Sequence, residues 1–443
     1  MFSNKDLRKL IIPLVIEQLL AVTIGMADTV MVSSCGEAAV SGISLVDSIN
    51  FLLITLFSSL ATGGAVIASQ YIGRGDHKSA SLAAKQLFYA SLALSAVLGV
   101  IAVFFRKPVL NMVFGSIEAD VMAHAQIYFL LSAISYPFLA VYNAGAALFR
   151  SMGDSRTTML ISILMNTINI VGNAILIYGF QMAAAGAATA SLVSRAVGAI
   201  IITVLLLNPR RIIFYDKLHK PEIHLSMLKS ILQIGVPNGL ENSIFQIGKI
   251  LVASIVSGFG TISITANAVA GNLASLQVIP GMALGMAMIT VVGQCIGAGE
   301  KEQARYYTKR LVSLVWVLLL ICNIFLYIFI PNLATLFNLS SEAISACVEI
   351  LRLYSIMASL FWTLSFTLPN ALRAAGDSRF TMLVSMISMW AVRVGLSYFF
   401  VYQLNMKLTG VWLAMCLDWT VRGVIFWIRF RQGKWKTYRV IGE

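Results

Sequence analysis

Residues 148–160 read LFRSMGDSRTTML, and residues 372–383 repeat the pattern as LRAAGDSRFTML. The arginine, glycine and aspartate of the first copy each lie 223 residues before their counterparts in the second, as Arg150 and Arg373 show. A match between two segments that lie about half a chain apart indicates a tandem duplication.

The same spacing, within one residue, recurs in other parts of the chain. Glu17 matches Glu241, and each follows a proline by four residues. The loop sequence QYIGRGD at residues 70–76 matches QCIGAGE at residues 294–300. In a chain this apolar, a duplication is typical of membrane transporters that are built from two repeats.

Composition excludes a soluble protein. The 443 residues are 58% hydrophobic and only 12% charged, whereas a soluble domain carries roughly 25% charged residues. The net charge of +13 does not indicate nucleic-acid binding, because the charges lie in short loops between apolar runs. We therefore expect an all-α integral membrane protein with lipid, and no nucleic acid, as its surroundings.

Twelve runs are long and apolar enough to cross a bilayer as helices. They cover residues 10–34, 43–70, 84–104, 121–147, 157–179, 184–207, 229–257, 265–292, 309–330, 343–369, 380–402 and 408–428. Each repeat therefore holds six spans. Because six is even, both repeats enter the membrane from the same side, and a pseudo-twofold axis along the membrane normal relates them.

The distribution of basic residues predicts the orientation. If both termini are cytoplasmic, 24 of the 32 Lys and Arg residues lie on the cytoplasmic side and three lie outside. We expect a multi-pass protein of the cell membrane, with an N-lobe at residues 1–215 and a C-lobe at residues 216–443. The polar segment 208–227, which contains His219 and His224, is predicted to be a solvated linker.

Asp28 is the principal candidate for a functional site, because it lies deep in the first apolar run. A charge at that depth costs about 2.5–3.5 kcal/mol on insertion scales, and intramembrane acids are functional by default. A proton or a bound cation can neutralise the carboxylate, and the two charge states can prefer different conformations. The competing interpretation is a carboxylate that caps a neighbour or marks the outer end of the span.

The duplicated acids Glu17 and Glu241 leave two interpretations open. They could be symmetric coupling groups, since a proline one turn earlier can open a polar pocket beside each acid. They could equally be a packing device at the cytoplasmic ends of the two spans. Lys249 lies two helical turns after Glu241, so we expect a buried ion pair between them.

Other polar residues inside the spans suggest pairing. Asp418 and Arg422 are four residues apart, a spacing at which side chains meet on a helix. Asn169 and Asn173 share a helix face, where amides bind cations or, more commonly, join helices. Arg195 and Arg393 are predicted to face a cavity or to pair across helices. The five cysteines have no metal-ligand spacing, so no metal site or disulfide is expected.

At this point the chain resembles the multidrug and toxic compound extrusion (MATE) transporters, of the MOP flippase superfamily, over essentially its whole length. The resemblance is carried by Asp28-Thr29-Val30-Met31-Val32, by the two Gln-x-Ile-Gly loops and by the paired Arg-x-x-Gly-Asp-Ser-Arg loops. Asn169 and Asn173 with the following Leu-Ile-Tyr-Gly complete it.

The resemblance implies two six-helix lobes around a central cleft, and efflux of compounds by alternating access, driven by H⁺ or Na⁺. It implies that Asp28, Asn169, Asn173 and Ser191 form a cation site in the N-lobe. The family often has an aspartate at the position of Asn173, so this chain lacks one negative charge, and H⁺ is the more expected coupling ion. Some members have a carboxylate in the seventh span, where Glu241 lies.

The expected substrates are small organic compounds that are cationic or amphipathic, carried by a monomer that needs no cofactor besides the coupling ion. Tyr354, Met357, Phe361 and Trp362 could line the cleft, although aromatic stripes more often pack. No enzyme motif is present. The alternative function is a flippase for lipids or lipid-linked oligosaccharides, in which Arg195, Lys249 and Arg393 would attract a pyrophosphate.

Overall fold

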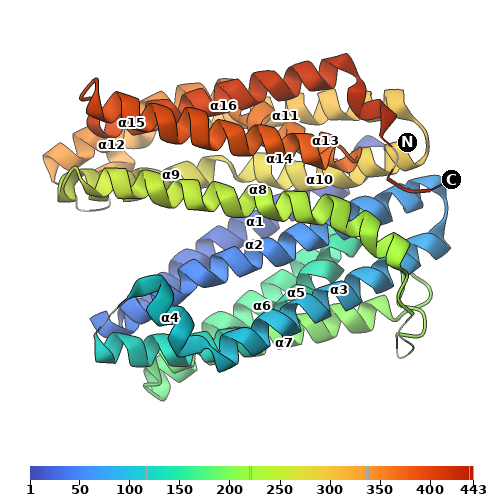
Figure 1. Cartoon of the computed structure of the whole chain (residues 1–443), viewed down its shortest axis with the longest axis horizontal. Coiled ribbons are helices and arrows are strands. Elements are labelled where there is room, and N and C mark those ends of the chain that lie inside the picture. The colour runs from blue at the N-terminus through green and yellow to red at the C-terminus, as the bar shows by residue number, and fades with distance from the viewer. Residues whose placement is uncertain are drawn as a thin grey trace. The chain divides into compact units, whose positions relative to one another are not determined.

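The computed structural model of the chain (Figure 1) describes residues 1–443 except 116, 117, 219, 221, 336, 338, 339, 439 and 443. Within helix α1 the side chains of Ile24, Met26, Ala27 and Thr29 also fall outside the description. No strand occurs among the residues described, so the predicted all-α class is confirmed.

Helices occupy all twelve predicted runs. Eleven described helices are long and apolar enough to cross a membrane, and the remaining predicted run, residues 10–34, corresponds to α1. The first half contains α1 (Asn4–Ser33), α2 (Glu37–Arg74), α3 (His77–Phe104), α4 (Arg106–Phe114), α5 (Ala119–Ser151), α6 (Ser155–Asn173), η1 (Ala174–Gly179) and α7 (Ala183–Leu206).

The second half has the same succession of long helices, interrupted by two π-helical segments, η2 and η3. It contains α8 (Leu225–Ser257), α9 (Thr261–Gln277), α10 (Ile279–Gly297), α11 (Lys301–Thr335), α12 (Ser341–Met357), η2 (Ala358–Thr367), α13 (Leu368–Ala374), α14 (Ser378–Ile387), η3 (Ser388–Val394), α15 (Gly395–Tyr402), α16 (Lys407–Gln432) and the short η4 (Lys434–Thr437).

One predicted span differs from the structure. Residues 265–292 were expected to form a single helix, but α9 ends at Gln277 and α10 begins at Ile279. Pro280 lies in the first turn of α10. Proline has no N–H to continue a preceding helix, whereas it fits the start of a new one, so the break falls directly before it.

The chain forms two compact units, Phe2–Gly239 and Leu240–Glu443, the second joined by Met1. In the N-terminal unit α5 is central and packs against α2, α3 and α7, while α1 packs against α6. In the C-terminal unit α16 packs against α15 and η2, and α10 packs against α11 and α13. A boundary between lobes at residues 215 and 216 stays a prediction.

Four connections between helices, all on the cytoplasmic side of the predicted topology, have the same two-residue pattern. In each, a glycine in the left-handed region ends a helix and an acidic residue begins the next. At these positions glycine has no Cβ to clash. The pairs are Gly75–Asp76, Gly153–Asp154, Gly299–Glu300 and Gly376–Asp377, with glycine φ values of 80°, 81°, 78° and 99°.

Two of these acids cap the next helix directly. Asp76 accepts from the backbone N–H of Ser79 at 2.9 Å, and Asp154 accepts from that of Thr157 at 3.1 Å. The hydrogen bonds from Ser79 hold the pKa of Asp76 below its ordinary value, so this cap is ionised at neutral pH. Of the two duplicated Gly-Asp loops, the first therefore caps its helix through Asp154, whereas Asp377 makes no side-chain hydrogen bond to the start of α14.

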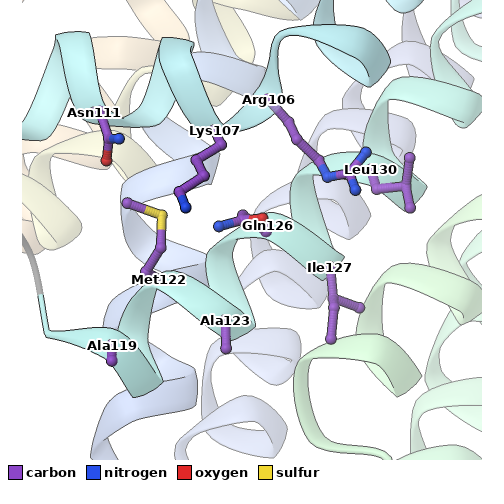
Figure 2. A pocket seen from close by; sticks show the side chains of 9 residues that line it. All are labelled: Arg106, Lys107, Asn111, Ala119, Met122, Ala123, Gln126, Ile127 and Leu130. Carbon is purple, nitrogen blue, oxygen red and sulfur yellow. The ribbon is translucent and has the colours of Figure 1, made fainter.

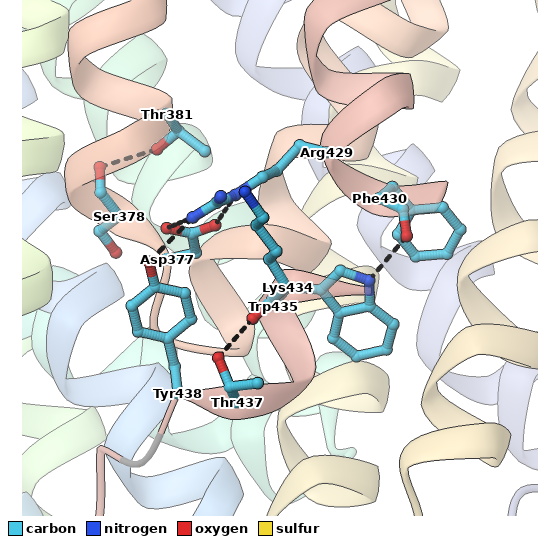
Figure 3. A network of polar contacts seen from close by, with 9 residues as sticks. All are labelled: Asp377, Ser378, Thr381, Arg429, Phe430, Lys434, Trp435, Thr437 and Tyr438. Atoms are coloured by element: carbon cyan, nitrogen blue, oxygen red, sulfur yellow. Dashed lines mark hydrogen bonds and ion pairs between the residues drawn. The ribbon is translucent and has the colours of Figure 1, made fainter. Parts of the chain in front are cut away.

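The duplicated aspartates also bind an arginine from the end of their own repeat. Asp154 pairs with Arg211 at 2.9 Å, and Asp377 accepts from Arg429 Nε at 2.8 Å and from its Nη2 at 3.3 Å. Figure 3 shows this second pair, where Arg429 also donates to the Tyr438 hydroxyl at 2.8 Å. Asp377 is almost fully buried, whereas both partners of the first pair are about one-third exposed.

The segment 208–227 that follows α7 is mostly exposed, as expected of a solvated linker, and a few of its residues anchor it to the N-terminal unit. Ile213 and Tyr215 are buried. Gln86 of α3 donates to the Glu222 carbonyl at 2.6 Å and accepts from the His224 N–H at 3.0 Å. His219 lies outside the described residues.

The two aspartate–arginine pairs allow a matched test. Asp377→Asn removes the negative charge from an almost fully buried site beside the Arg429 guanidinium, which is 14% exposed, so we expect a loss of about 3–5 kcal/mol. Asp154→Asn breaks a pair that water screens, so the loss should be within about 1 kcal/mol. Thermal unfolding of the purified protein in detergent measures both. Equal losses from the two substitutions would contradict the assignment of the Asp377 pair as the stronger joint.

Candidate functional site

Asp28 of α1 lies among amides of α6. Asn173 Nδ2 donates to Asp28 Oδ1 at 2.9 Å. Asn173 is buried, and Asp28 is only partly exposed. The two asparagines at residues 169 and 173 are one turn apart, so both side chains reach the carboxylate from the same helix face.

The surroundings decide the orientation of the Asn169 amide. With its nitrogen turned toward α1, it donates to Asp28 Oδ1 at 2.8 Å and to Oδ2 at 3.1 Å, and its oxygen accepts from Ser191 Oγ at 3.0 Å. The structure therefore brings together Asp28, Asn169, Asn173 and Ser191, the four residues predicted to form one site.

The site has an acceptor without a donor. Asn173 Oδ1 is buried and has no hydrogen-bond partner among the described residues. Leaving such an atom unsatisfied costs about 1–3 kcal/mol. Together with the Asp28 carboxylate, this oxygen makes the site rich in acceptors, which favours a ligand that is a cation or a proton.

A second carboxylate, Asp47 of α2, was missed by the sequence analysis. It accepts from the Tyr128 hydroxyl at 3.0 Å and from Asn50 Nδ2 at 3.3 Å, and Tyr136 in turn donates to Asn50 Oδ1 at 2.8 Å. Asp47 is close enough to Asp28 for the two charges to interact. The available signal was an acid three residues before an asparagine inside the apolar run 43–70.

Arg195 of α7 is a cation close to these two acids. Its Nη1 donates to Ser135 Oγ at 2.7 Å, and its charge interacts with both Asp28 and Asp47. With both acids ionised, the three groups carry one net negative charge. Uptake of a single cation or proton makes the group neutral, as a coupling site requires.

The duplicated glutamates lie in ion pairs. Glu17 lies 3.5 Å from Arg150 Nη1 and accepts from Thr158 Oγ1 at 3.0 Å, while Glu241 accepts from Arg373 Nη2 at 2.7 Å. Glu17 is eleven residues before Asp28, about 16 Å along the helix. The geometry favours the packing interpretation, because each acid already has a cation of its own repeat.

The structure also decides two predicted pairings in the C-terminal unit. Asp418 and Arg422 form the expected ion pair, at 3.3 Å, and both side chains are buried. The ion pair expected between Glu241 and Lys249 is wrong, because the partner of Glu241 is Arg373. The duplicated spacing of Glu17 to Arg150 and of Glu241 to Arg373 was the signal for this pairing.

The four predicted cleft residues do not share one environment. Tyr354 is buried, donates to the Ala274 carbonyl at 3.2 Å and packs edge-on against Trp412 and Trp419. Trp362 is buried and stacks on Phe366. Met357 and Phe361 are partly exposed. Tyr354 and Trp362 thus contribute to packing within the C-terminal unit, and a role of these four residues in a cleft stays a prediction.

A cavity of about 700 Å³ lies where α4 meets α5, away from the predicted residues. Figure 2 shows Lys107, Asn111 and Gln126 among the side chains that line it. Its lining contains no carboxylate, and Asp28, Asn169 and Asn173 are not among the residues that line it.

Comparison with known families identifies the chain. The MatE family model matches twice, at residues 13–175 and 237–399, with the same offset of 224 residues that relates Glu17 to Glu241. The chain belongs to the MatE family. Its two matches confirm the duplication, and its resemblance to MATE transporters is established for both repeats.

Relatives of this MatE-family chain cover its whole length. It is 28% identical to the "Probable multidrug resistance protein NorM" of Thermotoga maritima, over 99% of this chain and 94% of the relative. It is also 28% identical to the "Uncharacterized transporter YisQ" of Bacillus subtilis, over 96% and 93%. A "Crystal structure of MATE in the bent conformation" superposes with a TM-score of 0.89 at 21% identity, covering 97% and 94% of the two chains.

The asparagines around Asp28 allow a test in which a second negative charge is added to the site. Asn173→Asp replaces an atom 2.9 Å from Asp28 with a carboxylate oxygen, and two carboxylates this close cannot both ionise without a cation. We expect Na⁺ to raise the thermal stability of this variant at about pH 8 more than that of the wild type.

The control is Asn166→Asp, since the Asn166 amide bonds to Ser162 at 3.3 Å, one turn from the group. If both variants respond to Na⁺ alike, the carboxylate of residue 173 does not share a cation with Asp28.

Proposed function

We propose that this protein is a secondary active efflux transporter, which exchanges H⁺ for small organic compounds that are cationic or amphipathic. The observation that carries the proposal is the Asp28 group: a carboxylate within a spanning helix, with amide donors and one unsatisfied acceptor, Asn173 Oδ1. Membership of the MatE family and the naming of relatives as multidrug resistance proteins support the same function.

In this proposal, the charge of Asp28 couples two access states. When Asp28 is ionised, the group of Asp28, Asp47 and Arg195 is negative and favours a cationic substrate. A proton on Asp28 makes the group neutral and removes that attraction. A ligand shifts a conformational equilibrium only by its difference in affinity between the states, and loss of a charge supplies such a difference.

Several contacts favour H⁺ over Na⁺ as the coupling ion. Hard cations take several oxygen ligands in one shell. Both oxygens of Asp28 already accept from amide nitrogens, and Asn173 Oδ1 is the single buried amide oxygen of this group left without a donor. A proton needs one oxygen, so it fits the group with less rearrangement than a metal ion.

The remaining parts of the proposal concern the cell. We infer that the protein lies in the cell membrane as a monomer with both termini in the cytoplasm. The excess of Lys and Arg in the loops assigned to that side supports the orientation.

The alternative, a flippase for lipids or lipid-linked oligosaccharides, has less support. It relied on three cations, Arg195, Lys249 and Arg393, to attract a pyrophosphate. Arg195 donates to Ser135 and interacts with two acids, which reduces its attraction for an anion. Transfer of a pyrophosphate-linked lipid between leaflets of protein-containing vesicles, without an ion gradient, would favour the flippase instead.

The coupling proposal is tested in vesicles that contain the purified protein. We expect a pH gradient to drive the transport of ethidium, and Asp28→Asn to reduce that transport by about 5- to 150-fold, the usual range of a coupling energy. A Na⁺ gradient of equal size, imposed without a pH difference, serves as the second arm and should drive little transport.

The matched control is Asp120→Asn, which removes an exposed acid in the first turn of α5. Transport that survives Asp28→Asn under the pH gradient would rule out Asp28 as the coupling acid. Transport driven by Na⁺ alone would overturn the choice of ion.

A further inference from the structure

Two of the three basic residues in the loops assigned to the outer side are neighbours in the chain. Arg106 and Lys107 follow the third span, and Lys407 is the third such residue. Basic residues are depleted from the outer loops of membrane proteins, so a pair of them at one place needs a physical reason. The structure places both in the lining of the cavity between α4 and α5.

Helix α4 has three different faces. Leu110 is fully buried and belongs to a hydrophobic core that also contains residues of α2, α3 and α5. Lys107 and Asn111, one turn apart, line the cavity. Met112 and Val113 are 90% and 55% exposed. A short helix that is anchored by one face and leaves apolar side chains bare on another is typical of a segment in the membrane interface.

The opposite wall of the cavity is a single stripe of α5. Its residues recur every three or four positions, which places them on one helix face. They are Ala119, Met122, Ala123, Gln126, Ile127 and Leu130. Figure 2 shows the side chains of Lys107 and Gln126 extending toward one another from the two helices. This wall therefore combines one amide with an apolar surface that hydrocarbon can contact.

The two cations of the cavity lack an acidic partner. Neither Arg106 nor Lys107 forms an ion pair with a residue that the structure describes. Arg106 Nη1 instead donates to the Val103 carbonyl at 3.0 Å. The nearest acids along the chain, Glu118 and Asp120, are exposed and do not line the cavity. The lining thus carries positive charge that no carboxylate balances.

This combination of groups matches an anionic phospholipid better than a small anion. Lys and Arg bind phosphate oxygens through charged hydrogen bonds, and amides donate to the same oxygens or to headgroup hydroxyls. A free phosphate would use only these polar groups. Phe104 and Phe105, directly before Arg106, are 76% and 56% exposed and add to the apolar surface that acyl chains can cover. Basic pockets beside spanning helices bind lipid headgroups in other membrane proteins.

The cavity also lies where lipid headgroups are found. Helix α3 (His77–Phe104) has 28 residues and is therefore about 42 Å long. It begins beside the Gly75–Asp76 connection, and its far end reaches the opposite interface of a bilayer whose hydrocarbon core is about 30 Å thick. Arg106 follows that far end by two residues.

We propose that this cavity binds an anionic phospholipid. The phosphate lies between Arg106 and Lys107 of α4 and Gln126 of α5. The acyl chains lie along Ile127 and Leu130. The lipid in this proposal is a bound ligand and not the compound carried, so the proposal depends neither on the coupling ion nor on the transported substrate.

The test titrates the full-length protein in non-ionic detergent with dihexanoylphosphatidylglycerol and dihexanoylphosphatidylcholine, and measures binding by calorimetry. Both lipids contain the phosphate, but only the first has a net negative charge. We expect the wild type to bind phosphatidylglycerol about fivefold more tightly or better. Lys107→Gln should weaken that binding about fivefold, the usual contribution of one basic residue beside anionic lipid, and should leave phosphatidylcholine binding unchanged. Lys107→Glu should abolish the preference.

The matched control is Lys407→Gln, which removes the third outer cation, an exposed residue that does not line the cavity. It should keep the wild-type preference. Lys107 is itself exposed, so its replacement leaves the anchor at Leu110 in place, and phosphatidylcholine binding shows that each variant retains its apolar surface. Equal affinity of the wild type for the two lipids would overturn the proposal, as would equal effects of Lys107→Gln and Lys407→Gln.

A soluble phosphodiester could supply the same anion, so glycerophosphoglycerol, the same headgroup without acyl chains, is titrated as well. We expect it to bind at least about tenfold more weakly, because the contacts of the chains are lost. An affinity equal to that of phosphatidylglycerol would assign the cavity to a soluble ligand and overturn the lipid. These titrations use no ion gradient, so their outcome and that of the coupling test are independent of one another.

Discussion

Charge inside a hydrocarbon environment must be paired, and the pairing of one glutamate with one arginine in each repeat organises this structure. Glu17 with Arg150 and Glu241 with Arg373 join the first helix of a repeat to the last turn of its fourth span. After each of these helix ends, a glycine with positive φ and an aspartate lead into the next helix, and in the first repeat the aspartate also caps it. In each repeat, the contact between the first and fourth spans thus depends on one ion pair and one Gly-Asp step.

Away from these joints, the two interiors have opposite electrostatic character. The N-terminal unit holds Asp28 and Asp47 against a single arginine, and an unsatisfied acceptor. The C-terminal unit holds Arg393 and Lys249 in addition to its two buried ion pairs, Glu241–Arg373 and Asp418–Arg422. Each imbalance costs free energy of folding, which is expected of groups retained for binding rather than for stability.

Much of the fold could be predicted from the sequence, because hydropathy determines which segments can cross a bilayer and a six-span repeat constrains the topology. The break before Pro280 was missed, since an apolar run does not reveal where two helices replace one. The four residues around Asp28 were grouped correctly, but Asp47 was not, because its nearness to Asp28 depends on how α2 packs beside α1. Arg393 lacked a visible partner in the sequence, because its surroundings, the Phe245 ring and the charge of Asp418, come from other helices.

The two repeats have kept the same Gly-Asp loops but differ in the residues of their interiors, which suggests how they diverged after the duplication. After the duplication, substitutions that disturbed a glycine–aspartate joint would have cost both copies their fold, whereas the helix faces turned toward the ligands could change independently. One chain thereby carries two interiors of different charge on a repeated scaffold. Selection on either half could then broaden the range of compounds handled without a second transporter.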